Sequence, residues 1–356
     1  MKFLCTFLLL LAIPVKYCLA YESDYTLYHK GIINAEREIF INKDSIMGLQ
    51  YFKNTFAAFD FVYVDDCIEA FELALYFRKE DMALTFIKKA IDNGFETSLL
   101  DSLSMECSCN MYLNRRVKVT IHKAFVTKYR HDLEVYTAMY YPKYLARINK
   151  ELLGTILKRH VREQAFKNYP VTNRDELKLK NEEYARISDD NLRYIDSLAR
   201  QGIYIGERNL GIYTNRLADS MRFPFIAVEN QAKNIKSYYH LPVDYRIPFL
   251  SQYDYFETNP VYIIYFHNTK AFDVLKQYKD DAIKKGFMHP REYASLQFKP
   301  RGITDTLYLY PSTHQITATQ TINKCRAALL LPEYEIDFYK HKFAHEHNLR
   351  LNFGFL

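Results

Sequence analysis

Residues 80–97, "EDMALTFIKKAIDNGFET", have the spacing of one amphipathic helix that ends at a glycine. The apolar residues recur every three or four positions, which places them on one face of a helix. This apolar stripe consists of Ala83, Phe86, Ile87, Ala90 and Ile91. Gly94 follows the stripe and predicts the end of the helix, because glycine readily takes the left-handed conformation that closes many helices.

The preceding segment, residues 63–81, repeats the helical spacing. Its apolar positions are Val64, Ile68, Phe71, Leu75 and Phe77. Asp65 and Asp66 stand near its start, where the helix dipole favours negative charge. Lys79 and Glu80 make a short polar break before the next helix. Two such helices form an antiparallel hairpin, and since one hairpin cannot bury its own face, further helices must stack on it.

Residues 69–95, "EAFELALYFRKEDMALTFIKKAIDNGF", resemble a tetratricopeptide-type hairpin. Ala83 stands where the two helices approach, and "KKAIDNGF" closes the second helix. Residues 28–59 are a candidate for an earlier helical pair. The resemblance implies a stack of hairpins with a concave binding surface.

Farther along the chain, helical patterns cover residues 111–128 and 133–166. The pair Tyr169-Pro170 closes this region, because proline disfavours helix in the residue before it. Residues 173–201 fit one long surface helix, or two helices broken at Ser188-Asp189. Residues 98–110 and 238–260 have the composition of loops, and a short helix is expected within 207–220.

The C-terminal part continues the helical pattern with one exception. A helix through Leu275 and Ile283 is expected to end at Gly286, and residues 289–298 predict a helix with Pro290 in its first turn. Residues 304–321 alternate and predict a small β-hairpin. Residues 321–348 predict helix interrupted at Pro332.

The predicted fold is therefore mostly α: tetratricopeptide-like helical hairpins followed by a helical domain with a small β element. The predicted division is a signal peptide at 1–20, a helical domain at 21–170 and a C-terminal helical domain at 171–356.

The first twenty residues, "MKFLCTFLLLLAIPVKYCLA", have the order of a secretory signal peptide. Lys2 precedes an apolar run that is too short for a bilayer span of about 20 residues, and Ala20 is a plausible cleavage residue. The alternative is an uncleaved anchor. The prediction is an exported chain, periplasmic or extracellular, with no membrane span after cleavage.

Removal of residues 1–20 lowers the formal charge from +6 to +4. This mild charge disfavours nucleic-acid binding. Cys67, Cys107, Cys109 and Cys325 remain, and their even number permits disulfides in an oxidising compartment, with the pairing left open. The chain has 31 Tyr, 25 Phe and no Trp, which suits amphipathic helix packing or, alternatively, an aromatic ligand groove.

The second half, roughly residues 175–340, is similar to a family of uncharacterised bacterial exported proteins. The shared elements are a charged helix at Asp189 to Leu192, a histidine after an apolar run (His267), a helix ended by Gly286, and "EYASLQFKPRG" at residues 292–302. Three features of the family differ here. Gln297 and Phe298 replace an Asp-Arg pair, Phe266-His267 replaces a doubled histidine or Gln-His, and "LYLYPS" replaces a Gln-Tyr-Gly-Thr stretch. The resemblance implies no established activity.

His267 is the first candidate for chemistry, as a general base or a ligand. Tyr293 and Arg301 could complete a polar pocket with it. The alternative is a hydrogen-bonded core histidine. His341 and His345 lie four residues apart, so a helix would present both on one side as a weak candidate metal site; the alternative is incidental metal affinity.

No glycine-rich phosphate loop, nucleophile elbow or cysteine protease signature occurs in the sequence, and no cofactor is predicted. The first functional hypothesis is a protein-binding or scaffold module that contacts another protein through its helical-repeat surface. The alternative is a hydrolase or ligand-binding protein with a polar site around His267.

Overall fold

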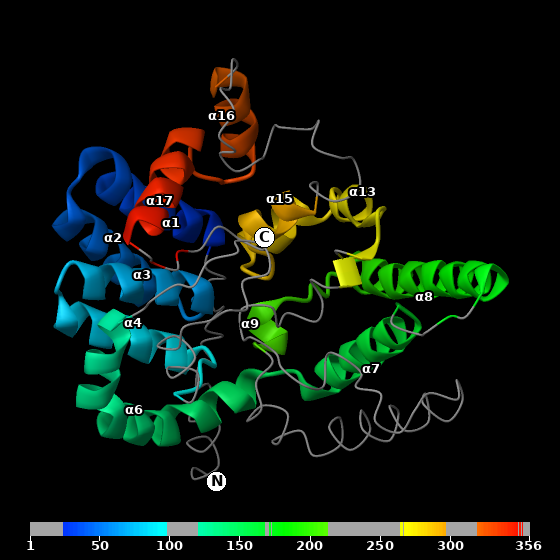
Figure 1. Cartoon of the computed structure of the whole chain (residues 1–356), viewed down its shortest axis with the longest axis horizontal. Helices are drawn as coiled ribbons and strands as arrows, with labels where there is room; N and C mark the ends of the chain where they lie inside the picture. Colours follow the sequence, from blue (N-terminus) through cyan, green and yellow to red (C-terminus); the bar gives the residue numbers. More distant parts are fainter. Residues whose placement is uncertain are drawn as a thin grey trace, which may run out of the picture.

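The structure is a computed structural model that describes residues 24–97, 120–167, 171, 173–212, 264–265, 267–296, 319–347, 349 and 351. This part is 78% helical, with 13 α-helices and no strand, which confirms the mostly α fold (Figure 1). The predicted β-hairpin lies outside the described residues except for its last residues 319–321, where the prediction is wrong because they form the first turn of α16 (Thr319–Ala328). The predicted loops at 98–110 and 238–260 lie outside the described residues. Within the described ranges, no helix is both long and apolar enough to cross a bilayer.

Residues 25–58 form the earlier helical pair that the pattern of residues 28–59 predicts. Helix α1 (Tyr25–Arg37) runs into the π-helical segment η1 (Glu38–Asn42), and α2 (Ser45–Ala58) follows. Both α-helices begin at an aspartate. Asp24 accepts a hydrogen bond from the amide of Thr26, and Asp44 accepts one from the amide of Met47, so a first-turn amide of each helix is satisfied.

Residues 64–92 form the predicted hairpin of α3 (Val64–Tyr76) and α4 (Glu80–Asp92). The whole predicted stripe of α4 is buried. Gly94 has a φ of +107°, and a Cβ there would lie 2.3 Å from the Tyr144 ring. Both the turn and the close approach of Tyr144 therefore require glycine at this position.

The predicted break between residues 128 and 133 is wrong, because α6 runs without interruption over Thr120–Arg147. Residues 129–132 are polar but contain no glycine or proline, so nothing in the backbone stops the helix there. Pro142 also lies inside α6. The chain breaks instead before α7 (Lys150–Lys167), where the side chain of Asn149 accepts from the amide of Leu152.

Residues 174–200 form one helix, α8 (Arg174–Arg200), so the alternative break at Ser188-Asp189 is wrong. Ser188 is buried in the continuous helix. The short helix expected within residues 207–220 is α9 (Glu207–Leu210), which ends at Gly211 with a φ of +71°; residues 213–220 lie outside the described chain.

The C-terminal helices agree with most of the expected boundaries. The expected helix through Leu275 and Ile283 is two short helices, α13 (Ala271–Leu275) and α14 (Lys279–Lys284), followed by Gly286. The predicted helix with Pro290 in its first turn is α15 (Pro290–Ser295). The predicted interruption at Pro332 separates α16 (Thr319–Ala328) from α17 (Tyr334–His347).

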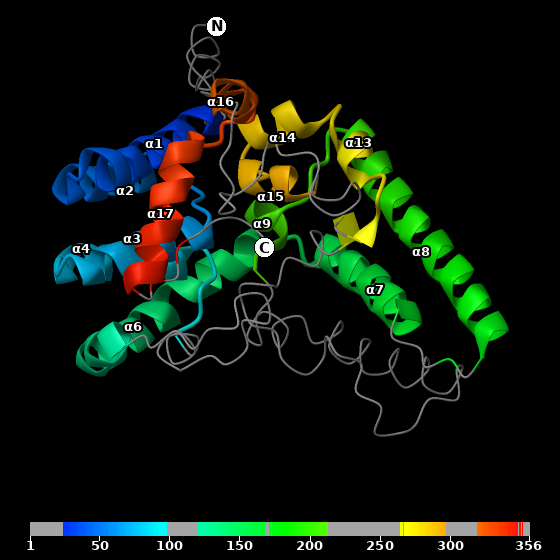
Figure 2. The same cartoon turned by 45° about the horizontal axis from the view of Figure 1, so that its top comes forward.

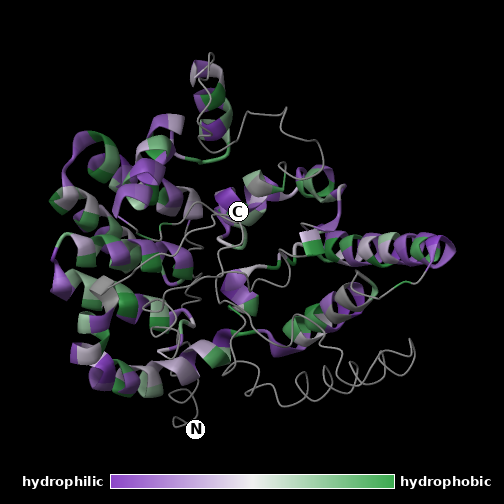
Figure 3. Cartoon of the chain, viewed as in Figure 1, coloured by the Kyte–Doolittle hydropathy of each residue, from purple (hydrophilic) through white to green (hydrophobic). Residues whose placement is uncertain are grey.

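The buried apolar side chains of the described residues form two clusters. The first joins α1 to α4 and the start of α6 with Ile336, Ala344, Leu349 and Leu351 from the C-terminal end. The second joins the end of α6 with α7, α8, α9, the described residues of 264–296, and Leu329 and Leu331. Helix α17 therefore returns to the N-terminal helices, beside α1 and α3 (Figure 2). The helices carry hydrophobic and hydrophilic residues together (Figure 3), as amphipathic helices do.

The division of these clusters falls inside α6, between Leu133 and Tyr141. The boundary near residue 170 stays a prediction about domains. Cys67 is buried and Cys325 half-buried, and both carry free thiols. The disulfides that the sequence allows for Cys67 and Cys325 are therefore not formed, and Cys107 and Cys109 lie outside the described residues.

Candidate functional site

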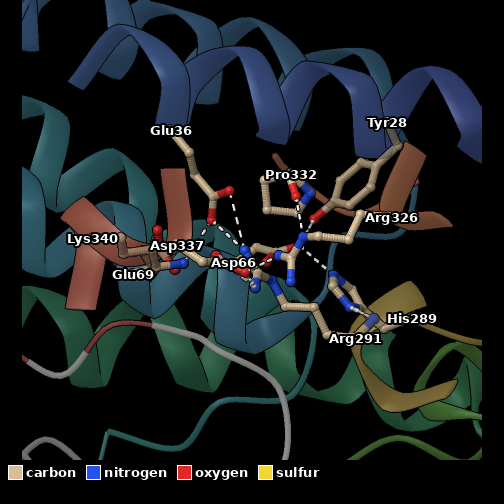
Figure 4. Close-up of polar contacts among 10 residues, drawn as sticks. All are labelled: Tyr28, Glu36, Asp66, Glu69, His289, Arg291, Arg326, Pro332, Asp337 and Lys340. Atoms are coloured by element: carbon tan, nitrogen blue, oxygen red, sulfur yellow. Dashed lines mark hydrogen bonds and ion pairs between the residues drawn. The ribbon is translucent and has the colours of Figure 1, made fainter. Parts of the chain in front are cut away.

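Ionisable side chains from five helices meet in the interior of the protein (Figure 4). We call this set the charged junction; its members are Glu36 of α1, Glu69 of α3, Arg291 of α15, Arg326 of α16, and Asp337 and Lys340 of α17. Each of these six side chains is at most 4% exposed. The junction therefore connects α1 to α17, the first and the last of the described helices.

Arg291 binds two carboxylates at once. Its Nη2 lies 2.9 and 3.1 Å from the two oxygens of Glu36, and its Nη1 lies 3.0 and 3.1 Å from the two oxygens of Asp337. Each carboxylate thus receives both of its bonds with Arg291 from one guanidinium nitrogen. Such charge-assisted bonds are about twice as strong as neutral ones, so Arg291 is the centre of the junction.

Lys340 and Arg326 complete the pairing. Lys340 Nζ donates to Glu36 Oε1 at 2.6 Å and to Glu69 Oε2 at 2.5 Å. Arg326 donates to Asp337 through Nη2 and to the carbonyl of Pro332 through Nε, at 2.6 Å for the latter. The carbonyl of Pro332 lies in the turn between α16 and α17, so Arg326 fixes that turn as well as the carboxylate.

Two carboxyl groups of the junction, Asp337 and Glu69, have shifted pKa values. Burial would raise the pKa of Asp337, but Arg291, Arg326 and Lys340 hold it below its ordinary value. Burial raises the pKa of Glu69 to about 8, and the Glu36 carboxylate adds to this while Lys340 opposes it. The folded chain consequently keeps a proton on Glu69 at pH values where an ordinary glutamic acid is ionised.

The raised pKa of Glu69 predicts a pH dependence of stability. The folded chain holds a proton on Glu69 that the unfolded chain loses above its ordinary pKa of 4.5, so this contribution is full below about pH 4.5 and is lost as the pH rises to about 8. Relative to Glu69→Gln, we expect the unfolding equilibrium constant of the wild type to rise about tenfold per pH unit in this window. Urea denaturation at pH 5, 6, 7 and 8 measures it, and parallel curves for the two proteins would contradict it.

A second buried polar set adjoins the junction on the side of α15. It consists of Tyr28, His29, Tyr63, Asp66 and His289. Tyr28 donates to Asp66 Oδ2 at 2.7 Å, and His289 Nε2 lies 3.6 Å from the same oxygen. His289 Nδ1 accepts from the amide of Arg291 at 3.1 Å, so this histidine caps the helix that carries the central arginine.

The candidate residue His267 pairs with a glutamate that the sequence pattern does not single out. His267 Nδ1 lies 2.7 Å from Oε1 of Glu163, whose side chain is fully buried at the α7–α8 interface. Asn191 of α8 donates to the other oxygen of Glu163 at 2.7 Å. The Tyr184 ring lies 6.4 Å from the His267 ring.

This arrangement has the geometry of an oriented imidazole. The short contact with the carboxylate assigns a proton to Nδ1, so Nε2 is the nitrogen that can accept a proton when the ring is neutral. A carboxylate that fixes the tautomer in this way is a recurring part of general-base sites. Burial, with the nearby Glu163 carboxylate, raises the pKa of Tyr184, so Tyr184 stays protonated beside this pair.

The other candidate residues lie elsewhere. Tyr293 is buried, stacks on the Phe272 ring at 4.8 Å and donates to the Phe272 carbonyl at 3.4 Å. Arg301 lies outside the described residues, so a pocket of these residues with His267 stays a prediction. His341 and His345 are exposed on α17, and in the described ranges no group of three or more His, Cys, Asp or Glu side chains is placed to hold a metal ion.

The charged junction and Glu163 were missed by the sequence patterns. One signal was present: Glu36 shares a face of α1 with His29 and Ile32, and Asp337 and Lys340 are three residues apart on α17. Ionisable residues on an apolar face indicate buried pairs. The partners themselves are 255 and 304 residues from Glu36, and no local pattern gives them. In comparisons with family models, curated proteins and solved structures, nothing matches this chain.

Proposed function

We propose that the chain is an exported protein-binding scaffold whose partner contacts an exposed apolar surface at η1, α2 and α17. We call this surface the apolar corner; its members are Ile41, Ile46, Met47, Phe338 and Tyr339. All of them are exposed, Ile46 by 66% and Tyr339 by 43%. Exposed apolar residues that gather in one place mark protein-interaction sites more often than scattered ones do.

Contacts between neighbouring residues support the grouping of these side chains. Lys43 Nζ lies over the Tyr339 ring at 5.2 Å, and Lys43 stands between Ile41 and Ile46 in the sequence. Phe40 and Phe343 meet at 5.6 Å, which packs η1 against α17. The corner thus combines apolar anchors with an exposed cation, a composition that suits a protein partner.

The charged junction supports a rigid presentation of the corner. Helices α1 and α17, which flank it, are tied through Glu36 to Lys340 and Arg291. Ordered buried pairs restrict how these helices can shift relative to each other, and a preorganised surface loses less entropy on binding.

The α3–α4 turn offers a second surface feature. A pocket of about 610 Å³ lies between this turn and α6, with Leu75, Met82 and Phe125 among apolar lining residues and Arg78 and Glu80 among charged ones. It belongs to the hairpin that resembles a tetratricopeptide unit, and it could accept a side chain of the same partner.

Export is part of the proposal and rests on residues 1–20, with their lysine, short apolar run and small residue at the end. N-terminal sequencing of the protein from its source tests it: a chain that begins near residue 21 is expected, and a retained residue 1 would contradict cleavage.

Affinity capture with residues 21–356 as bait, from the exported fraction of the source, tests the binding function. The variant Ile46→Ser with Tyr339→Ser removes apolar anchors from both parts of the corner. We expect it to bind the captured partner at least about 30-fold more weakly, as for the loss of interface hot spots. Binding is measured by titration with the purified partner.

The matched control is Leu177→Ser with Leu179→Ser, which removes two exposed apolar side chains from α8, 42% and 65% exposed. It should bind as the wild type does. Equal binding by the corner variant, or equal loss in the control, would contradict the corner as the partner surface.

The second candidate function is a hydrolase or ligand-binding protein at His267, and the oriented His267–Glu163 pair favours it. The same capture with a His267→Ala bait separates the two functions. A protein partner retained by this variant supports the scaffold. A co-purifying small molecule that the wild type holds and the variant loses, with no protein partner, supports the alternative.

A further inference from the structure

Two histidines face each other in the interior where α1 meets α15. The rings of His29 and His289 lie 5.0 Å apart and perpendicular, and the Tyr63 ring lies 5.8 Å from the first and 4.8 Å from the second. His29 is 2% exposed and His289 is 7% exposed. Among the described residues, Nε2 of either histidine has no hydrogen-bond partner. Neutral rings can be buried in this way at a modest cost, whereas charged rings cannot.

The charges around the pair do not compensate a protonated His29. Arg291 lies on the same helix turn as His289 and adds positive charge. Asp66 of α3 is the nearest carboxylate, 3.6 Å from His289 Nε2, and it already accepts from Tyr28. A proton on His29 would therefore lie near the cation of Arg291, and the nearest carboxylate, Asp66, is shared with Tyr28 and His289.

Two further acids face this region from other elements. Glu292 of α15 accepts from the backbone amide of His289 at 3.0 Å. Glu207 of α9 accepts from the amide of Val64 at 2.8 Å, and burial raises its pKa well above the ordinary value. Tyr25 of α1 donates to Asp60 at 2.9 Å. Each of these groups is committed to another partner.

We propose that the His29–His289 pair is an acid-sensitive latch between α1 and α15. Neutral rings keep the helices packed and the charged junction closed. Protonation of His29 places a cationic ring beside Arg291 in a buried space, and the C-terminal helices α15 and α17 separate from the N-terminal helices. This regulation goes beyond the proposed function and does not depend on the identity of a partner.

The direction of the effect follows from His29. Burial lowers its pKa well below the ordinary 6.5; His289 and Arg291 act in the same direction and Asp66 opposes them. The open or unfolded chain therefore takes up a proton below about pH 6.5 that the closed chain does not. The contribution of His29 to stability is complete above pH 6.5. Below pH 6.5 the equilibrium constant for closing falls about tenfold per pH unit.

Amide hydrogen exchange of the full-length protein at pH 7.0 and 5.0, corrected for the intrinsic rates, tests the latch. The comparison variant is His29→Phe, which keeps an aromatic ring between Tyr28 and Tyr63 but cannot be protonated. From pH 7.0 to pH 5.0, the protection factors of the amides in α15 and α17 should fall about 30-fold more in the wild type than in this variant. The comparison also cancels the opposite contribution of Glu69, which both proteins share.

A second variant, His289→Asn, keeps an acceptor for the amide of Arg291 and removes the imidazole ring that faces His29. A thermal melt shows whether His29→Phe folds. If it does not, the same comparison of protection factors is made between the wild type and His289→Asn. Helices α7 and α8 serve as the internal reference. An equal loss of protection in wild type and variant, an absence of any loss, or a parallel loss in α7 and α8 would each overturn the latch.

Discussion

Replacing Arg291 with methionine is expected to lower the free energy of unfolding by about 3–5 kcal/mol. The substitution keeps much of the side-chain volume but removes the partner that binds both Glu36 and Asp337 through four hydrogen bonds of 2.9–3.1 Å. Two buried carboxylates then depend on Lys340 and Arg326 alone. An incompletely paired buried charge costs far more than an ion pair contributes at the surface.

Urea denaturation at pH 7 measures this loss. The control is Arg186→Met on α8, where the arginine is 53% exposed and pairs with Glu183 and Asp190. Exposed pairs contribute about 0–1 kcal/mol, so the control should change little. A loss below about 1 kcal/mol for Arg291→Met would mean that the junction is open or hydrated in solution.

The second large effect is expected at Gly206, which precedes α9. A Cβ at this position would lie 1.7 Å from the carbonyl oxygen of Phe287 and 2.7 Å from its carbon. These are backbone atoms, so no side-chain rotation relieves the overlap. Gly206→Ala should therefore cost about 3 kcal/mol or more, at the upper end of overpacking effects, because α9 must move away from the turn after α14.

Gly202→Ala separates this overlap from backbone strain. Gly202 has a φ of +76°, but no atom lies within 4 Å of its would-be Cβ. Its cost should be that of a left-handed alanine, about 1–2 kcal/mol. Thermal melts of both variants make the comparison, and a smaller cost at Gly206 than at Gly202 would contradict the close approach of Phe287.

Much of the fold could be predicted from local patterns because they record which face of each helix is buried. The apolar stripe of α4, the stop at Gly94 and the interruption at Pro332 each depend on residues close in the sequence. The error at residues 128–133 arose because polar residues on an exposed stretch of α6 resemble a loop in composition. Only the absence of glycine and proline distinguishes the two.

The site was less predictable for a physical reason. A histidine after an apolar run pointed to His267, but its partner Glu163 lies 104 residues away. The charged junction joins residues of α1 and α3 to residues of α15 to α17, and each charge is tolerated in the interior only because its distant partners are present. Such pairs leave no trace in local spacing, since each helix by itself shows only an ionisable residue on an apolar face.

Glu36 of α1 and Arg291 of α15 meet in one buried junction. A double-mutant cycle with Glu36→Gln and Arg291→Met, followed by urea denaturation, measures their coupling directly. A coupling energy of about 1–3 kcal/mol is expected for groups in one buried network. Additive effects, with a coupling of zero within about 0.3 kcal/mol, would show that Glu36 and Arg291 do not meet in the folded protein.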